Sequence, residues 1–122
     1  MDRLFLLLAS VSGFLAVAVG AFGAHLLRDR LTPELRQAFE SGHRQHVLHV
    51  VALLAVAWAS TRWPGGATTT AGWLFVAGTI LFSGSLYLLA ITGQRWLGAV
   101  TPVGGLAFLL GWLILAWRVW TA

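Results

Sequence analysis

The four histidines are the residues of this chain with the greatest capacity for chemistry. His46 and His49 are spaced so that a helix places them on one face, and His25 closes the preceding apolar run. Imidazoles grouped in this way bind a metal ion or haem, or they form hydrogen bonds between helices. The chain has no cysteine, and its apolar runs contain no acidic residue. Because a metal site needs about three or four ligands, we expect no metal, no cofactor and hydrogen-bonded histidines.

Glycines, hydroxyl residues and these histidines gather in four short motifs. The motifs are G-A-F-G-A-H (Gly20 to His25), R-Q-H-V-L-H (Arg44 to His49), L-F-S-G-S-L-Y (Leu81 to Tyr87) and G-A-V-T-P-V-G-G (Gly98 to Gly105). In an antiparallel helix bundle all four lie in the same half. We therefore predict that any small ligand binds in that half. The candidate residues are His25, Gln45, His49, Ser83, Ser85, Tyr87, Thr101, Gly104 and Gly105.

The composition places the elements that carry these motifs in a membrane. Hydrophobic residues make up 58% of the 122 residues and charged residues 10%, against about 45–50% and about 25% in soluble domains. All basic residues are arginines scattered along the chain, whereas nucleic-acid binding needs a clustered basic patch. We expect the lipid bilayer as a partner and no nucleic acid. The first apolar run continues to Leu27, which is too long for a signal peptide, so we expect a retained helix.

Four runs are long enough for a transmembrane helix, which needs about 20 apolar residues. We predict an all-α integral membrane protein with a single domain over residues 1–122. The expected spans are about 4–27, 45–61, 71–92 and 97–118. Short connections make neighbouring helices antiparallel, so the predicted fold is an up-down-up-down bundle of four transmembrane helices.

The connection between the first two spans contains signals for a helix of its own. Thr32 is a suitable N-cap, and Pro33 suits the first helical position. Apolar residues then recur on one face at Leu31, Leu35 and Phe39. We expect a short amphipathic helix at the membrane interface that ends near Gly42.

Thr101 and Pro102 predict the start of the fourth helix, with Thr101 as N-cap and Pro102 in the first helical position. This start leaves residues 93–100 irregular. The backbone amides of Gly104 and Gly105 would then face the bundle from a helix N-terminus. Such amides hold an anion or a carbonyl oxygen, or they serve only in helix capping.

His25 is expected to reach the start of the second helix. A buried imidazole without a partner costs about 1–3 kcal/mol, so we expect hydrogen bonds from His25 to Gln45 and His49. Gly20 and Gly23 would admit a neighbouring backbone, and Phe22 would fill the adjacent space. Small residues also form stripes along the first and fourth spans, which indicates close helix packing. The stripes are Ala9, Gly13, Ala16, Gly20 and Ala24, and Gly104, Ala107 and Gly111.

The arginines predict the orientation of the chain. The connections after the first and third spans carry Arg28, Arg30, Arg36, Arg44 and Arg95, and the other side carries Arg3, Arg62 and Arg118. The positive-inside rule places the richer side in the cytoplasm and both termini on the trans side. Because the excess is small, reversed or dual insertion is the alternative.

The four motifs, followed by Gly111-Trp112, resemble the YgdD-type family of small four-helix membrane proteins. The resemblance covers nearly the whole chain. It implies a multi-pass protein of the bacterial inner membrane with no established biochemical activity. The chain departs from the family pattern at Arg44, where a tyrosine usually stands, whereas Gln45 and His49 match it.

Three classes of function remain. We expect no enzyme, because the sequence offers no pairing of a nucleophile with a base and no acid dyad. The favoured class is a non-enzymatic accessory, structural or small-ligand-binding membrane protein. The alternative is an oligomeric conduit or transporter for small molecules or ions, without a carboxylate for proton coupling. A homo-oligomer, or a subunit of a membrane complex, is the expected assembly.

Overall fold

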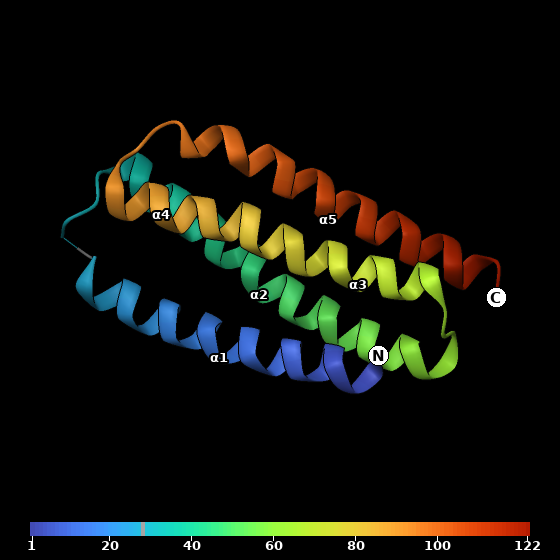
Figure 1. The fold of residues 1–122 in the computed structure, drawn as a ribbon. Helices are drawn as coiled ribbons and strands as arrows, with labels where there is room; N and C mark the ends of the chain where they lie inside the picture. The colour runs from blue at the N-terminus through green and yellow to red at the C-terminus, as the bar shows by residue number, and fades with distance from the viewer. Residues whose placement is uncertain (28) are drawn as a thin grey trace.

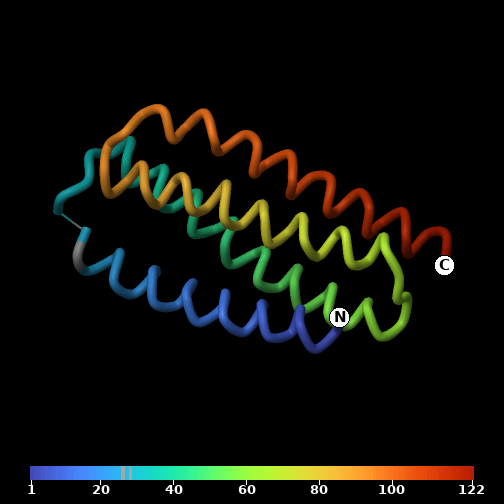
Figure 2. The backbone as a smooth tube through the Cα atoms, in the orientation of Figure 1, coloured from blue at the N-terminus to red at the C-terminus, as the bar shows by residue number. Residues whose placement is uncertain are grey.

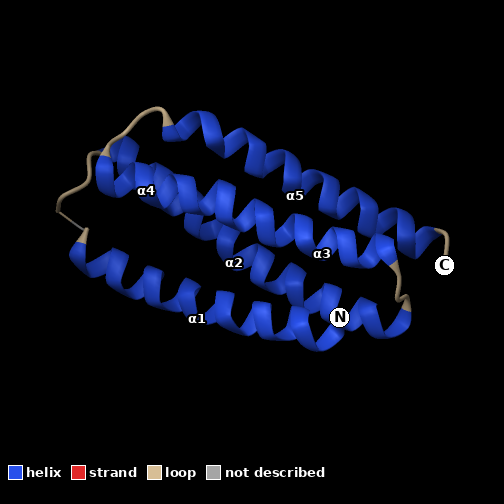
Figure 3. Ribbon diagram, viewed as in Figure 1, coloured by secondary structure: helices blue, strands red, loops and turns tan. Residues whose placement is uncertain are grey.

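Helices joined by short turns make up the fold. The computed structural model describes residues 1–27 and 29–122, apart from the side chain of Leu26, and this part of the chain contains no strand (Figure 3). The helices form four rods. They are α1 (Asp2–Leu26), α2 (Pro33–Arg62), a third rod made of α3 (Gly66–Gly78), the π-helical segment η1 (Thr79–Ser83) and α4 (Gly84–Thr92), and finally α5 (Leu97–Trp120).

Three of the four rods are long and apolar enough to cross a membrane. These segments are Asp2–His25, Gly66–Thr92 and Leu97–Trp120. The rod α2 is less apolar because it begins with charged turns and carries three histidines. The all-α fold is therefore confirmed, with three candidate membrane-spanning helices among four rods.

Successive rods run in opposite directions, and both termini lie at the same end of the bundle (Figures 1 and 2). The rod α1 packs against α2, α2 packs against the third rod, and the third rod packs against α5. Gly93 ends α4 in the left-handed conformation, with φ 71°, which costs a glycine little. Its N–H donates to the carbonyl of Leu89 at 2.8 Å. Arg28, one of the arginines used to predict orientation, lies outside the described residues.

The start predicted at Thr32 is confirmed, but the separate interfacial helix is wrong. The Thr32 hydroxyl accepts from the N–H of Leu35 at 3.3 Å, and Pro33 occupies the first turn. The helix then continues without a break to Arg62. Gly42 does not end it, because this glycine is buried in contact with α4 rather than placed in a turn.

The predicted start of the fourth helix is also wrong. The rod α5 begins at Leu97, so Pro102 lies inside it and the irregular segment ends before Leu97. The N–H of Gly98 donates to the carbonyl of Arg95 at 3.0 Å, which winds a first turn ahead of the proline. Gly104 is therefore in the helix interior, and its amide does not form an N-terminal anion site.

Small residues set the distance between the rods. A Cβ at Gly104 would meet the backbone of Phe82, and one at Gly111 would meet the Phe75 ring and the carbonyl of Ala71. These contacts explain the stripe predicted in α5. On α1, Ala9 and Ala16 are buried, and Gly20 lies against the His43 ring. Phe5, Phe75 and Phe108 fill the core between the rods.

We predict that Gly104→Ala lowers the free energy of unfolding in detergent. The added methyl meets the backbone of Phe82, which can move only if α5 and the third rod separate, and overpacking of this kind costs about 1–3 kcal/mol. Gly84→Ala is the matched control, because a Cβ there meets no atom within 4 Å. It should be neutral or slightly stabilising, since alanine favours a helix by about 1 kcal/mol over glycine. Equal unfolding curves for the two variants would contradict the close approach at Gly104.

Candidate functional site

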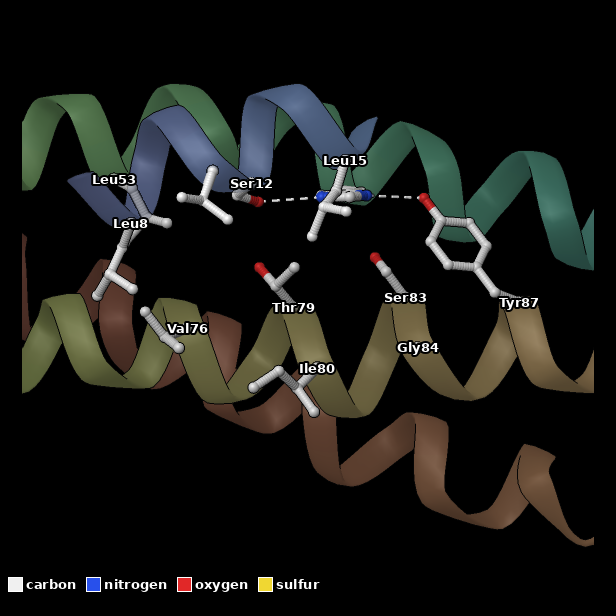
Figure 4. A pocket seen from close by; sticks show the side chains of 12 residues that line it. Leu8, Ser12, Leu15, Leu53, Val76, Thr79, Ile80, Ser83, Gly84 and Tyr87 are labelled. Atoms are coloured by element: carbon white, nitrogen blue, oxygen red, sulfur yellow. Dashed lines mark hydrogen bonds between the residues drawn. The ribbon is translucent and has the colours of Figure 1, made fainter. Parts of the chain in front are cut away.

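The centre of the candidate site is a chain of hydrogen bonds across three rods. His46 on α2 is buried, with 4% of its surface exposed. Its Nε2 lies 3.0 Å from the Ser12 hydroxyl on α1, and its Nδ1 lies 2.9 Å from the Tyr87 hydroxyl on α4. Figure 4 draws both bonds as dashed lines. One imidazole thus joins α1, α2 and the third rod.

A groove of about 350 Å³ opens beside this chain, between α1 and the third rod, with α2 as its floor (Figure 4). Its volume falls within the range of about 300–1,000 Å³ that is usual for small-molecule sites. Its polar lining consists of Ser12, His46, Thr79, Ser83 and Tyr87. The remaining lining is aliphatic or glycine, and none of the described residues that line it is charged.

The π-helical segment η1 forms part of the wall opposite α1. Thr79 and Ser83 both face the groove (Figure 4). The Ser83 hydroxyl donates to the carbonyl of Gly42 at 2.7 Å, and Thr79 donates to the carbonyl of Phe75 at 2.8 Å. Because π-helical turns are frequent at functional sites, this irregularity is consistent with a site here.

His49 lies in a second polar contact, between α2 and α5. Its Nδ1 is 2.8 Å from the carbonyl of Gln45, and its Nε2 is 3.1 Å from the indole nitrogen of Trp112. An indole N–H can only donate, so Nε2 accepts and Nδ1 carries the proton. The ring stacks on Phe108 with centroids 3.5 Å apart. Both nitrogens and one face of His49 are therefore fully used.

The hydrogen bonds predicted for His25 are wrong. His25 is exposed and makes no hydrogen bond to another described residue, and Phe22 is 65% exposed rather than packed. The reason is helix register. Because α2 begins at Pro33, the end of α1 lies beside the first turns of α2, where Gly23 faces Phe39. Gln45 and His49 lie further along α2, beyond the reach of His25.

The other predicted residues fall into several groups rather than one cluster. Ser83 and Tyr87 line the groove beside His46, whereas Gln45, His49 and Gly105 line another groove, along α2 and α5. Tyr87 joins His46, Ser83 joins Gly42, and the Ser85 hydroxyl lies 2.6 Å from that of Thr101. Gly104 and Gly105 lie against Phe82. The polar groups of the predicted half are thus distributed over several helix interfaces.

The sequence analysis missed Ser12 and His46 as members of the site, and it missed Trp112 as the partner of His49. A polar residue deep in an apolar run is a signal for function. Ser10 gives the same signal, yet its hydroxyl donates to the carbonyl of Leu6 at 2.8 Å in its own helix. The two serines differ only in the helix face that they occupy.

His46 and His49 lie on one helix, but they form hydrogen bonds across different interfaces. His46 bonds to α1 and α4, whereas His49 bonds to α5. Among the described residues, no three His, Asp or Glu side chains come together in a group that could hold a metal ion.

Comparison with known proteins places the chain among small membrane proteins. A family model described as "protein of unknown function (DUF423)" matches residues 19–105. The chain is 42% identical over 91 residues to the membrane protein YwdK of Bacillus subtilis, covering 74% of each chain. It is 39% identical over 91 residues to the inner membrane protein YgdD of Escherichia coli K12, covering 75% of this chain and 70% of the relative. No solved structure matches significantly.

We predict that ¹⁵N NMR finds His49 with its proton on Nδ1. Trp112→Phe keeps an aromatic ring but removes the indole donor, so it should lower the free energy of unfolding by about 1 kcal/mol, a usual value for a hydrogen bond between membrane helices. Trp117→Phe is the control, because Trp117 is 60% exposed and its indole donates no hydrogen bond among the described residues. A proton on Nε2, or equal stability of the two variants, would contradict the assigned bond.

Proposed function

The chain belongs to the DUF423 family of membrane proteins, and we propose that it binds a small apolar ligand from the bilayer without carrying out a reaction on it. The resemblance to the YgdD-type family, based on four motifs, is confirmed by the family match and by the relatives. The chain is a helical membrane protein, and its relatives are called membrane or inner membrane proteins.

The groove between α1 and the third rod is the observation that carries this proposal. Its rim is formed by exposed aliphatic residues, among them Val11, Leu15 and Ile80, so the groove opens on the side of the bundle rather than at its ends. In a membrane this side faces lipid. A ligand that enters from the bilayer therefore needs no path through water.

Ser12 and His46 lie within hydrogen-bond distance, as a nucleophile and a base do in acyl-transfer enzymes. Two features favour binding over catalysis. The third group is the neutral hydroxyl of Tyr87, which offers no carboxylate to stabilise an imidazolium. The walls are helices, whose interior backbone N–H groups are engaged in helical hydrogen bonds and cannot form an oxyanion hole.

We further propose that α2 also spans the membrane, which brings the number of spans to four. Its first turns, from Pro33, would lie at the membrane interface. Support comes from its position between α1 and the third rod and from its buried Leu53 and Val56. A single bundle is better suited to binding than to conduction. Fully buried side chains, Phe5 and Phe75 among them, fill its core near the termini and would block a path through it. Conduction would need several copies.

The orientation follows from the arginines: we propose that the turns after α1 and α4 face the cytoplasm, with both termini on the trans side. We predict that Gly66→Cys reacts with an impermeant thiol reagent in intact cells, whereas Glu34→Cys reacts only after lysis. The chain has no native cysteine, so labelling reports the introduced thiol alone. The reverse pattern would contradict the orientation, and labelling of both would indicate dual insertion.

We predict that native mass spectrometry of the chain in lipid nanodiscs detects a bound apolar molecule. Gly84→Phe should abolish it, because Gly84 lines the groove and has open space beside it. Gly98→Phe is the matched control, since Gly98 also has open space but lies outside the groove.

The same spectra give the number of subunits and any bound partner chain, so they also test the proposed homo-oligomer or complex. If Gly84→Phe retained the molecule, the groove would not be its site. If the wild type carried no such molecule, the proposed function would fail.

A further inference from the structure

We propose that the occupant of the groove is an uncharged chain-bearing lipid with a carbonyl head, held by one spare hydroxyl hydrogen of the Ser12–His46–Tyr87 chain. This inference rests on the proposed function, because it requires that the groove binds a lipid. It adds the chemistry by which the lipid is recognised.

A count of hydrogens gives the spare donor. A neutral imidazole has one N–H and one nitrogen that accepts, and its two nitrogens here face two hydroxyls. One hydroxyl must therefore donate to His46, while the other must accept from it. The accepting hydroxyl keeps a hydrogen that His46 cannot take. If the tautomer changes, the spare hydrogen moves from Ser12 to Tyr87 or back, but it is never lost.

No described protein group takes this hydrogen. Ser12 and Tyr87 each make a single hydrogen bond among the described residues, and in both cases it is the bond to His46. The other two hydroxyls of the groove, Thr79 and Ser83, already donate to backbone carbonyls. In an apolar groove an unpaired hydroxyl hydrogen is costly. A carbonyl oxygen is the simplest head that satisfies it.

The lining also indicates an uncharged ligand with a defined direction. None of the described lining residues is charged, so an anionic head would enter without a counter-charge. The hydrogen-bonding chain ends at Tyr87 at one end of the groove, while Leu8 and Val76 line the other (Figure 4). The carbonyl head of the lipid therefore lies beside the hydrogen-bonded side chains, and its tail extends towards Leu8.

The test compares three probes of equal chain length on the full chain in nanodiscs: the methyl ketone heptadecanone, heptadecane and heptadecanoate. We expect the ketone to bind about three- to tenfold more tightly than the alkane, as one net hydrogen bond allows, and its carbonyl stretch to shift to lower frequency. Heptadecanoate should bind more weakly than the ketone. If none of the probes binds, the proposed function fails. If ketone and alkane bind equally, or heptadecanoate binds best, the groove binds lipid but this inference is overturned.

Variants then test the movable donor. The triple variant Ser12→Ala/His46→Leu/Tyr87→Phe removes all three hydrogen-bonded side chains. It should still bind the alkane, but it should no longer prefer the ketone or shift the ketone's carbonyl stretch. Ser10→Ala is the matched control and should change neither, because Ser10 lies on α1 outside the groove and its hydroxyl donates to the carbonyl of Leu6 in the same helix. Ser12→Ala and Tyr87→Phe should each keep the preference, because in each variant the remaining hydroxyl or an imidazole N–H still offers a hydrogen.

A preference lost in one single variant would overturn the movable donor and indicate a fixed one. If the triple variant retained the preference, the hydrogen-bonded residues Ser12, His46 and Tyr87 would not be the ones that recognise the carbonyl head. If the triple variant fails to fold, the carbonyl frequency of the bound ketone decides the question. It should differ from the wild-type value in Ser12→Ala and in Tyr87→Phe, because the donor changes, and should stay at the wild-type value in Ser10→Ala; an unchanged frequency in all three would overturn the inference.

Discussion

An imidazole inside an apolar bundle has no bulk water to bond to, so both of its nitrogens need partners on the surrounding helices. Two histidines on α2 impose this requirement on the whole bundle. His46 forms hydrogen bonds with hydroxyls of α1 and α4, and His49 accepts a hydrogen bond from the indole of Trp112 on α5. Every rod is therefore tied to α2. Lipid supplies no hydrophobic force for helix association, so these directional bonds and the glycine contacts determine which helices are neighbours.

The glycines and the histidines depend on one another. Side-chain bonds of about 3 Å across helices require backbones that approach closely, and such an approach requires residues without a bulky side chain. On α1, Gly20 makes room for the His43 ring, whose Nε2 lies 2.8 Å from the carbonyl of Ala16. On α5, Gly104 lies against the backbone of Phe82. The second contact keeps α5 close to the third rod, so that Trp112 comes within reach of His49.

The long helices could be predicted from the sequence, because charges and apolar runs mark them directly, and the helix start at Thr32 was recognised by its capping residues. The local signals failed where tertiary contacts override them. Gly42 is a stop signal in isolation, but here its carbonyl accepts from Ser83 of another rod. Pro102 is a start signal in isolation, but a turn of α5 already precedes it. The partners of His25 depended on helix register, which hydropathy does not determine. Of the polar residues that line the groove, Ser83 and Tyr87 were predicted, whereas Ser12, His46 and Thr79 were missed. Which polar residues meet depends on helix rotation, which η1 alters within the third rod.

The two histidines show why one contact can bind a ligand while the other only joins helices. They lie one turn apart on the same helix, and each has both nitrogens engaged. The partners of His49 are an indole, which only donates, and a backbone carbonyl, which only accepts. Together they use every hydrogen and lone pair of the ring and fix its tautomer. The partners of His46 are two hydroxyls, and each can donate or accept. One hydrogen is then left over in either tautomer, and it lies beside a groove lined by aliphatic side chains. The capacity to recognise a ligand therefore follows from the partners of the histidine rather than from the histidine itself.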